Sequence, residues 1–144
     1  MMRWGSVDFS QLKNLQKQLE SLDGKVICEA ALNEGAGRLL AKVRKRTPVD
    51  TGNLRRNWRI GKLRSAAGEP EVNINNHTKY ADYVEYGHRQ TPGRFVPAIR
   101  KRLKKSWVPG RFMLTKSMAE MEGQLEKIVE RRLMEALRKG GGIN

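Results

Sequence analysis

Apolar residues recur every three or four positions over two long parts of the chain, a pattern that predicts helices near both ends. The first part starts behind the capping residue Asp8 and carries a leucine stripe over residues 12–22. It breaks at Asp23-Gly24, and a second apolar face then continues to residue 46. The last part covers residues 112–138. We therefore expect a short first helix, a longer helix of about 30 Å ending near residue 46, and a C-terminal helix.

Between these helical parts, apolar and polar residues alternate, which is typical of strands with one buried face. Residues 57–64 and 71–75 alternate in this way, and the stretch 65–70 between them is rich in turn-forming residues. The pattern predicts an antiparallel hairpin that packs one face against the helices.

A second, shorter helical pattern follows the first predicted hairpin. Residues 80–87 place Tyr80, Tyr83 and Val84 on one face, which we expect to pack into the core, and Gly87 ends the helix. Such a helix would connect the first hairpin to the segment that follows it.

Residues 88–110 contain no acidic residue and carry dense positive charge. Two short apolar stretches, Phe95-Val96 and Ser106-Trp107-Val108, predict the strands of a second hairpin. A basic run would lie at its tip or along its arms, made of Arg100, Lys101, Arg102, Lys104 and Lys105. The predicted fold class is therefore α+β: a small antiparallel sheet packed by a long N-terminal helix and a C-terminal helix, with a basic hairpin or loop.

The segment Thr47–Leu54 separates the long helix from the first hairpin. Pro48 has no amide hydrogen and disfavours helical geometry at the residue before it, so the helix should end there. Asp50 and Thr51 can bond neighbouring backbone amides, and Gly52 allows a positive φ. We expect a structural corner rather than a catalytic role, because no base or metal ligand lies nearby in the sequence.

Composition indicates one domain over residues 1–144, with flexible ends at about 1–7 and 139–144. Only 6% of the residues are aromatic, so the core should consist of aliphatic side chains with the three tryptophans as large anchors. The formal net charge of +14 exceeds what solubility requires and predicts an anionic partner or a complementary acidic protein surface.

The single cysteine, Cys28, excludes an internal disulfide and is typical of a reducing compartment. Its helical context predicts a small buried side chain rather than a reactive thiol. No apolar run reaches the roughly 20 residues needed to span a bilayer, and no secretion signal is recognised at the N-terminus. We expect a protein that stays in the cell that makes it and has no membrane partner.

Candidate catalytic chemistry is sparse. The two histidines and one cysteine do not have metal-ligand spacing, and the glycine-flanked stretch 87–93 has no phosphate-binding signature. Glu85 and His88 could form an acid/base pair, but no nucleophile or oxyanion donor completes a site, and a helix surface or a salt bridge to arginine explains Glu85 better. The sequence predicts no enzymatic activity and no cofactor.

The basic run supports two alternatives. Clustered cations bind polyanions by releasing condensed counterions, and Trp107 beside them could stack on a base, although a core or subunit-contact role is more common for such a tryptophan. No DNA-reading motif is recognised. A loop that contacts solvent or protein is the preferred interpretation, and a sequence-independent nucleic-acid-binding protein is the alternative.

Three separated motifs together resemble the HK97 gp10-like family of tailed-phage tail-completion proteins. They are residues 47–56, 80–89 and 107–114, and with the flanking helices the resemblance covers most of the chain. The motif residues that carry it are Thr47, Pro48, Asp50, Thr51, Gly52, Leu54, Tyr80, Ala81, Val84, Glu85, Gly87, Gly110 and Phe112. The family implies a structural protein of phages and prophages at the head–tail junction, made in the host cytoplasm and carried in the virion, with no catalytic residues.

The resemblance also implies that copies form a ring and contact other neck and tail proteins. A ring needs one patch on each subunit that fits a different patch on the next. The candidate interaction residues are the basic run with Trp107, and the complementary surface is the acidic side of the C-terminal helix from Glu120 to Glu135. Some cations could also contact phage DNA without sequence preference.

Overall fold

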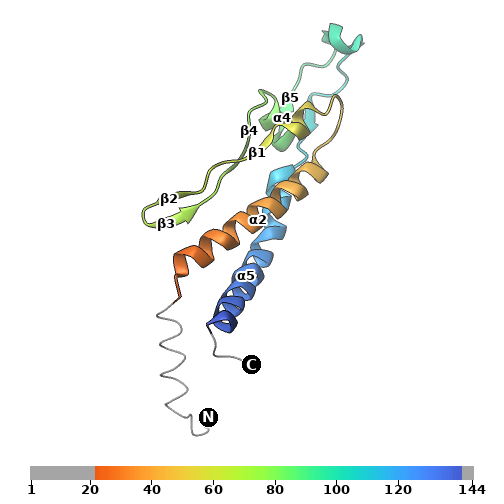
Figure 1. Cartoon of the computed structure of the whole chain (residues 1–144). Coiled ribbons are helices and arrows are strands. Elements are labelled where there is room, and N and C mark those ends of the chain that lie inside the picture. Colours follow the sequence, from red (N-terminus) through yellow and green to blue (C-terminus); the bar gives the residue numbers. More distant parts are fainter. Residues whose placement is uncertain (1–21, 141–144) are drawn as a thin grey trace, which may run out of the picture.

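A computed structural model describes residues 22–140 as two long antiparallel helices with two β-ribbons beside and beyond them (Figure 1). The helices are α2 (Gly24–Arg46) and α5 (Met113–Lys139). The predicted first helix lies outside the described residues, and so do Trp4 and the last four residues. The C-terminal helix continues through Lys139, so it includes one residue of the end that we expected to be flexible.

The elements between the two long helices are short. They are α3 (Asn53–Arg56), β1 (Trp58–Ile60), β2 (Arg64–Ala66), β3 (Glu69–Glu71), β4 (Ile74–Asn76), α4 (Ala81–Tyr86), β5 (Gly87–Arg89), β6 (Phe95–Val96), the 3-10 helix η1 (Pro97–Ile99), β7 (Lys101–Arg102) and β8 (Trp107–Pro109). All strand pairs are antiparallel, and the predicted α+β class is confirmed.

The ends of α2 follow from local chemistry. The Asp23 side chain caps the helix by accepting hydrogen bonds from the amides of Lys25 and Val26. At the other end Thr47 has left helical geometry, with ψ at 123°, as the proline after it requires. Gly52 has a φ of +81°, which confirms its predicted role in the corner. The sequence pattern did not predict α3, a single turn that follows this glycine.

Helices α2 and α5 are held together by close packing at their centre. A Cβ added at Gly35 would lie 3.1 Å from the Leu125 side chain, so the missing side chain lets the helices approach. Ala31, Met121 and Ile128 form a buried cluster beside this contact. The helix pair therefore has its own small apolar core.

Two glutamates form ion pairs across the same helix interface. Glu34 on α2 accepts hydrogen bonds from Arg131 and Arg132 on α5, and these lower the pKa of Glu34. Glu120 on α5 pairs with Arg46 and Lys42 on α2, and these hydrogen bonds lower the pKa of Glu120 to about 2. Each helix thus supplies one carboxylate to cations of the other.

The main core lies at the end of the helix pair where α2 stops and α5 starts. There the two helices meet α4 and the first ribbon. This core contains Val43, Leu54, Trp58, Ala81 and Met113. Trp58 is the anchor that the composition predicted. Its indole nitrogen donates a hydrogen bond to the Thr47 hydroxyl at 2.9 Å, and that hydroxyl donates to the Val43 carbonyl at 2.7 Å. This buried pair of bonds closes the corner after α2.

The first ribbon confirms the predicted hairpin and corrects its turn. Strand β1 pairs with β4, and β2 pairs with β3, so the turn is only Ala67-Gly68 rather than residues 65–70. The register changes by one residue between the two strand pairs, which leaves Lys62 and Leu63 opposite Val72. This is the geometry of a β-bulge, which bends the ribbon and increases its twist.

Two expectations about burial are wrong. Tyr80 and Tyr83 are exposed rather than in the core, because the buried side of the short α4 consists of Ala81 and Glu85, four residues apart. Cys28 is exposed because it lies near the start of α2, beyond the apolar residues that cover the middle of the helix.

Replacing Thr47 by Val should destabilise the fold by about 1–3 kcal/mol, because the buried indole N–H of Trp58 loses its acceptor. Thr47→Ser keeps the oxygen and removes one methyl group, so it should cost less, about 0.8 kcal/mol. Denaturant unfolding of the three proteins measures both effects. If Thr47→Val unfolds at the same denaturant concentration as the native chain, the hydrogen bond does not hold the corner.

The Glu120 ion pairs should make the free energy of unfolding depend on pH at the acidic end of the scale. The folded-state pKa is depressed from 4.5 to about 2, so their contribution is complete above about pH 4.5 and disappears as pH falls through about 2. The difference in unfolding free energy between the native chain and Glu120→Gln should therefore shrink over that range. At neutral pH, added salt should also shrink it because the carboxylate is exposed. A difference that stays constant from pH 5 to pH 2 contradicts this assignment.

Candidate interaction surface

Residues 87–109 form one long ribbon, which we call the basic hairpin, projecting beyond the ends of α2 and α4 (Figure 1). Strand β5 pairs with β8 at its base, and β6 pairs with β7 near its tip. The predicted pairing of residues 95–96 with 106–108 is therefore wrong. The turn lies at Pro97–Arg100, where Arg100 has a φ of +49°, and each strand pairs with the segment equally distant from that turn.

The basic hairpin joins the body through two glycines that lie opposite each other. Gly87 has a φ of +84°, and a Cβ there would lie 2.4 Å from the Val108 carbonyl oxygen. A Cβ at Gly110 would lie 2.3 Å from the Glu85 carbonyl oxygen. Any side chain at either position requires the backbone to move, so the base of the hairpin has a fixed, close-packed geometry.

Glu85 fixes the base of the hairpin to the start of α5. Its buried carboxylate accepts hydrogen bonds from the amides of Leu114 and Thr115 at 3.0 and 2.9 Å, and from the Thr115 hydroxyl at 2.7 Å. These amides belong to the first turn of α5, which has no side-chain cap of its own at Phe112. The expected surface or salt-bridge role of Glu85 is wrong; a distant carboxylate caps the helix.

Within residues 22–140, the cations of the basic hairpin have no ion-pair partner. Seven Lys and Arg residues lie between His88 and Gly110, and in the part of the chain that the structure describes no carboxylate lies within salt-bridge distance of any of them. Arg102 donates to the Gly93 carbonyl at 2.7 Å and braces the two arms. The hairpin therefore presents unneutralised positive charge.

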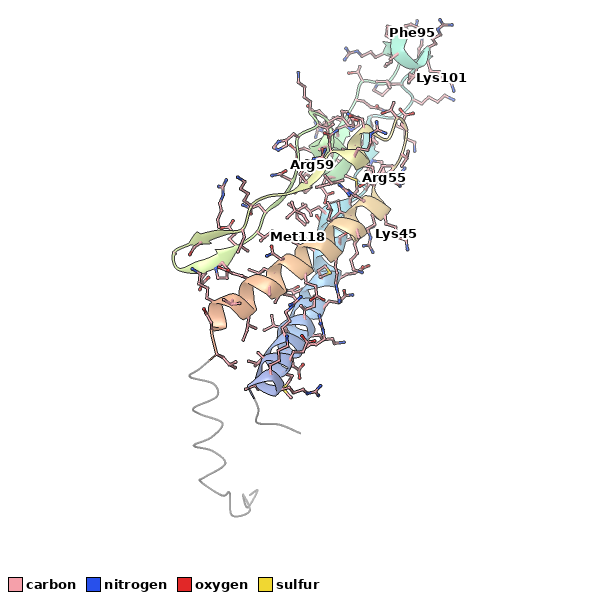
Figure 2. The ribbon with its side chains drawn as sticks, viewed as in Figure 1. Lys45, Arg55, Arg59, Phe95, Lys101 and Met118 are labelled. Atoms are coloured by element: carbon pink, nitrogen blue, oxygen red, sulfur yellow. The ribbon has the colours of Figure 1, made fainter. Side chains whose placement is uncertain are left out.

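Apolar side chains accompany this charge. Phe95 and Ile99 at the tip are 50% and 56% exposed, and Figure 2 shows Phe95 and Lys101 together at the far end of the ribbon. Trp107 at the base is exposed as well, so the expectation that it is a core anchor is wrong. An arm with both exposed apolar side chains and free cations is typical of a contact surface.

The predicted motif residues divide by location. Thr47, Leu54, Ala81 and Glu85 are buried and hold the core and the hairpin base together. Val84, Gly52, Gly87 and Gly110 are half-buried. Pro48, Asp50, Thr51, Tyr80 and Phe112 are exposed. The Thr51 hydroxyl accepts a hydrogen bond from the Asn53 amide at 3.3 Å, as the turn chemistry predicted. Most of the motif therefore stabilises the fold.

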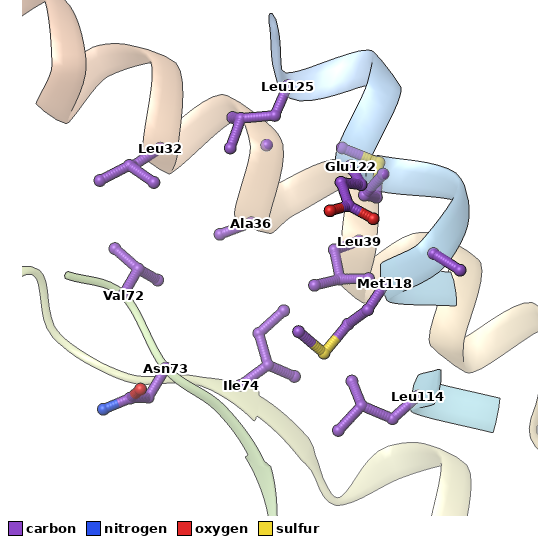
Figure 3. Close-up of a pocket in the computed structure, with 13 residues that line it drawn as sticks. Leu32, Ala36, Leu39, Val72, Asn73, Ile74, Leu114, Met118, Glu122 and Leu125 are labelled. Carbon is purple, nitrogen blue, oxygen red and sulfur yellow. The ribbon is translucent and has the colours of Figure 1, made fainter. Parts of the chain in front are cut away.

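Sequence reasoning missed a groove of about 530 Å³ between α2, α5 and the first ribbon. Figure 3 shows Leu32, Ala36 and Leu39 on one side of it, with Val72 and Ile74 from the ribbon and Met118 and Leu125 from α5 on the others. We call it the helix groove. The signal that could have revealed it is the apolar stripe of α5, which is wider than one partner helix can cover.

One carboxylate lies in the lining of the helix groove. Glu122 belongs to the groove, and with Glu126 and Glu130 it follows one side of α5 at intervals of four residues. We call these three exposed glutamates the acidic stripe. None of them has an ion pair within the described residues, whereas Glu120 and Glu135 pair inside the chain. The acidic surface predicted from Glu120 to Glu135 is thus reduced to the acidic stripe.

Other chemistry is limited in the described part of the chain. Between residues 22 and 140, side chains of His, Cys, Asp and Glu do not gather in threes that could hold a metal ion. None of the helices in that range has both the length and the apolar composition needed to cross a membrane.

Comparison with known proteins gives one family. The family model described as "Bacteriophage HK97-gp10, putative tail-component" matches residues 12–87, slightly more than half of the chain. The match includes the long helix, the corner, the first ribbon and α4, and it ends where the basic hairpin begins. Comparisons with curated proteins and with solved structures give no significant match. The chain belongs to the HK97 gp10-like family of bacteriophage tail components.

Proposed function

We propose that this protein is a structural subunit of the neck of a tailed phage or prophage, where it completes the tail at the head–tail junction. Copies associate into a ring and contact other neck and tail proteins. The subunit is made in the host cytoplasm, becomes part of the virion, and transforms no substrate. Family membership supports a structural role in the phage particle.

The observation that carries the proposal is the basic hairpin itself. It extends away from the helix pair, yet its base is fixed by Glu85 and by the close approach at Gly87 and Gly110. The hairpin supplies no residue to the two core clusters of the subunit, yet its base is firmly anchored. Such an arm is suited to contact another molecule. Its exposed phenylalanine and isoleucine would gain stability by burial in such a contact.

The charges of the chain support association between copies. A ring requires a heterologous interface, in which two different patches of the same chain fit each other. The basic hairpin offers cations and the acidic stripe on α5 offers carboxylates, and within residues 22–140 neither set has an ion pair. Opposite charge at the two patches would orient the copies and disfavour contact between two hairpins.

A second candidate function is sequence-independent nucleic-acid binding. The free cations of the basic hairpin and the exposed Trp107 near them favour it, since a polyanion can take up the charge and a base can stack on the indole. In a neck subunit, this chemistry would give weak contact with DNA that passes through the junction.

We expect replacement of Arg100, Lys101, Arg102, Lys104 and Lys105 by Ser to leave the chain folded and to block joining of tails to heads. These side chains are exposed and lie outside the core, so the body stays folded, although the Arg102 bond to the Gly93 carbonyl is lost from the hairpin. Complementation of a phage that lacks the gene, with virions counted by plaque assay and particles inspected by electron microscopy, measures the effect. Unjoined heads and tails should accumulate.

The matched control removes the same amount of charge elsewhere, by Ser substitution of the exposed cations Lys45, Lys62, Arg64, Lys79 and Lys116. Joining should proceed with this variant. A normal virion yield from the hairpin variant would overturn the proposed role of the basic hairpin.

A DNA titration at two salt concentrations separates the two candidate functions. A neck subunit should bind duplex DNA only non-specifically, with a Kd above about 1 µM at moderate salt. A dedicated nucleic-acid-binding protein should bind more tightly and lose affinity steeply as salt rises. Sub-micromolar binding that depends on the basic hairpin would favour the second candidate function over the first.

A further inference from the structure

The basic hairpin and the helix groove are two exposed surfaces that lie too far apart to contact each other within one subunit. Figure 2 shows Phe95 and Lys101 at the end of the ribbon and Met118 of the groove on the helix pair, far from them. Both surfaces nevertheless expose apolar side chains: Phe95 and Ile99 on the arm, and Met118, 54% exposed, on α5. Each surface therefore lacks a partner in the described chain.

The two surfaces have complementary chemistry. The end of the hairpin, residues 94–102, is a narrow two-stranded element with two exposed apolar side chains and the free cations Arg94, Arg100 and Lys101. The helix groove is lined mostly by apolar side chains and has the Glu122 carboxylate among them (Figure 3). Apolar surface can be buried in the groove while the cations reach carboxylates at its edge.

We propose that residues 94–102 of one copy dock in the helix groove of a second copy. Phe95 and Ile99 contact the apolar lining, and Arg100 and Lys101 pair with Glu122 and Glu126. This inference specifies the self-association in the proposed function and rests on that part of it. The contact is heterologous, since an arm meets a groove, so each copy both inserts its own hairpin and receives another.

Three features favour a second copy as the occupant. The charges of the arm and of the groove edge are opposite, and within residues 22–140 neither set has another ion pair. The hairpin is fixed at its base, so docking orders little additional backbone. A groove of about 530 Å³ is within the usual size range of binding pockets, which suits two side chains such as phenylalanine and isoleucine.

The apolar part of the proposal is tested with Phe95→Ser/Ile99→Ser and with Met118→Lys in the full chain. Sedimentation velocity of the purified proteins should show that each variant weakens self-association at least roughly tenfold. Val49→Ser is the matched control, because Val49 is 55% exposed and lies in neither surface. All of these positions are exposed, and circular dichroism with thermal unfolding checks that each variant is folded.

The charged part is tested by reversal in two separate chains, Arg100→Glu/Lys101→Glu and Glu122→Lys/Glu126→Lys. Each alone should lose self-association because like charges then face each other. A mixture of the two should associate again, since the native hairpin of one meets the native groove of the other and the reversed surfaces also match. The chain with all four substitutions should associate with itself.

Several outcomes overturn the inference. A native chain that stays monomeric at all concentrations excludes docking between copies. If Met118→Lys weakens association but the Phe95/Ile99 variant does not, another segment occupies the groove. If the mixture fails to associate, the two charged surfaces do not face each other. These results leave the neck role standing wherever the serine variant of the basic run still blocks joining of heads to tails, so the two failures are distinguishable.

Discussion

The arrangement of this molecule depends on a buried carboxylate that caps a helix from outside the helix. Glu85 accepts three hydrogen bonds from the first turn of α5, and the adjacent backbone bonds from Arg111 to Val84 and from Phe112 to Glu85 complete the junction. Helix α4, the base of the hairpin and the start of α5 are thereby fixed to one another. Leaving these amides and the carboxylate unpaired would be costly, because buried polar groups without partners lose their hydration and gain nothing. The direction in which the basic hairpin leaves the body follows from this junction.

Much of the fold could be predicted from the sequence because its signals are local. The end of α2 at Arg46 follows from Pro48, the corner follows from Gly52, and the two long helices follow from apolar spacing. The pairing of the second ribbon could not be predicted, because a basic stretch without alternation carries no register, and the position of the turn decides which segments meet. The role of Glu85 could not be predicted either, since its partners lie about thirty residues further along the chain.

The candidate surfaces were predicted only in part, because only some of their features have local signals in the sequence. The basic run is visible as composition, and its exposure in the structure agrees with that prediction. The acidic surface was overestimated, because the sequence does not show that Lys42 and Arg46 of α2 reach Glu120 across the helix pair. The helix groove was missed because three elements are needed to form it, and the only sequence signal for it is the width of the α5 apolar stripe. Ion pairs therefore separate the two regions: between α2 and α5, Glu34 and Glu120 pair with cations of the other helix, whereas within the described residues the cations of the basic hairpin have no ion pair.

We propose that this chain works as a repeated building block whose hairpin joins one copy to another. Electron cryomicroscopy of the purified full chain would show whether the hairpin makes this contact. We expect closed rings in which the density of each hairpin runs onto the helix pair of the adjacent subunit. Single subunits, or rings in which every hairpin points into solvent and touches no other copy, would contradict this proposal.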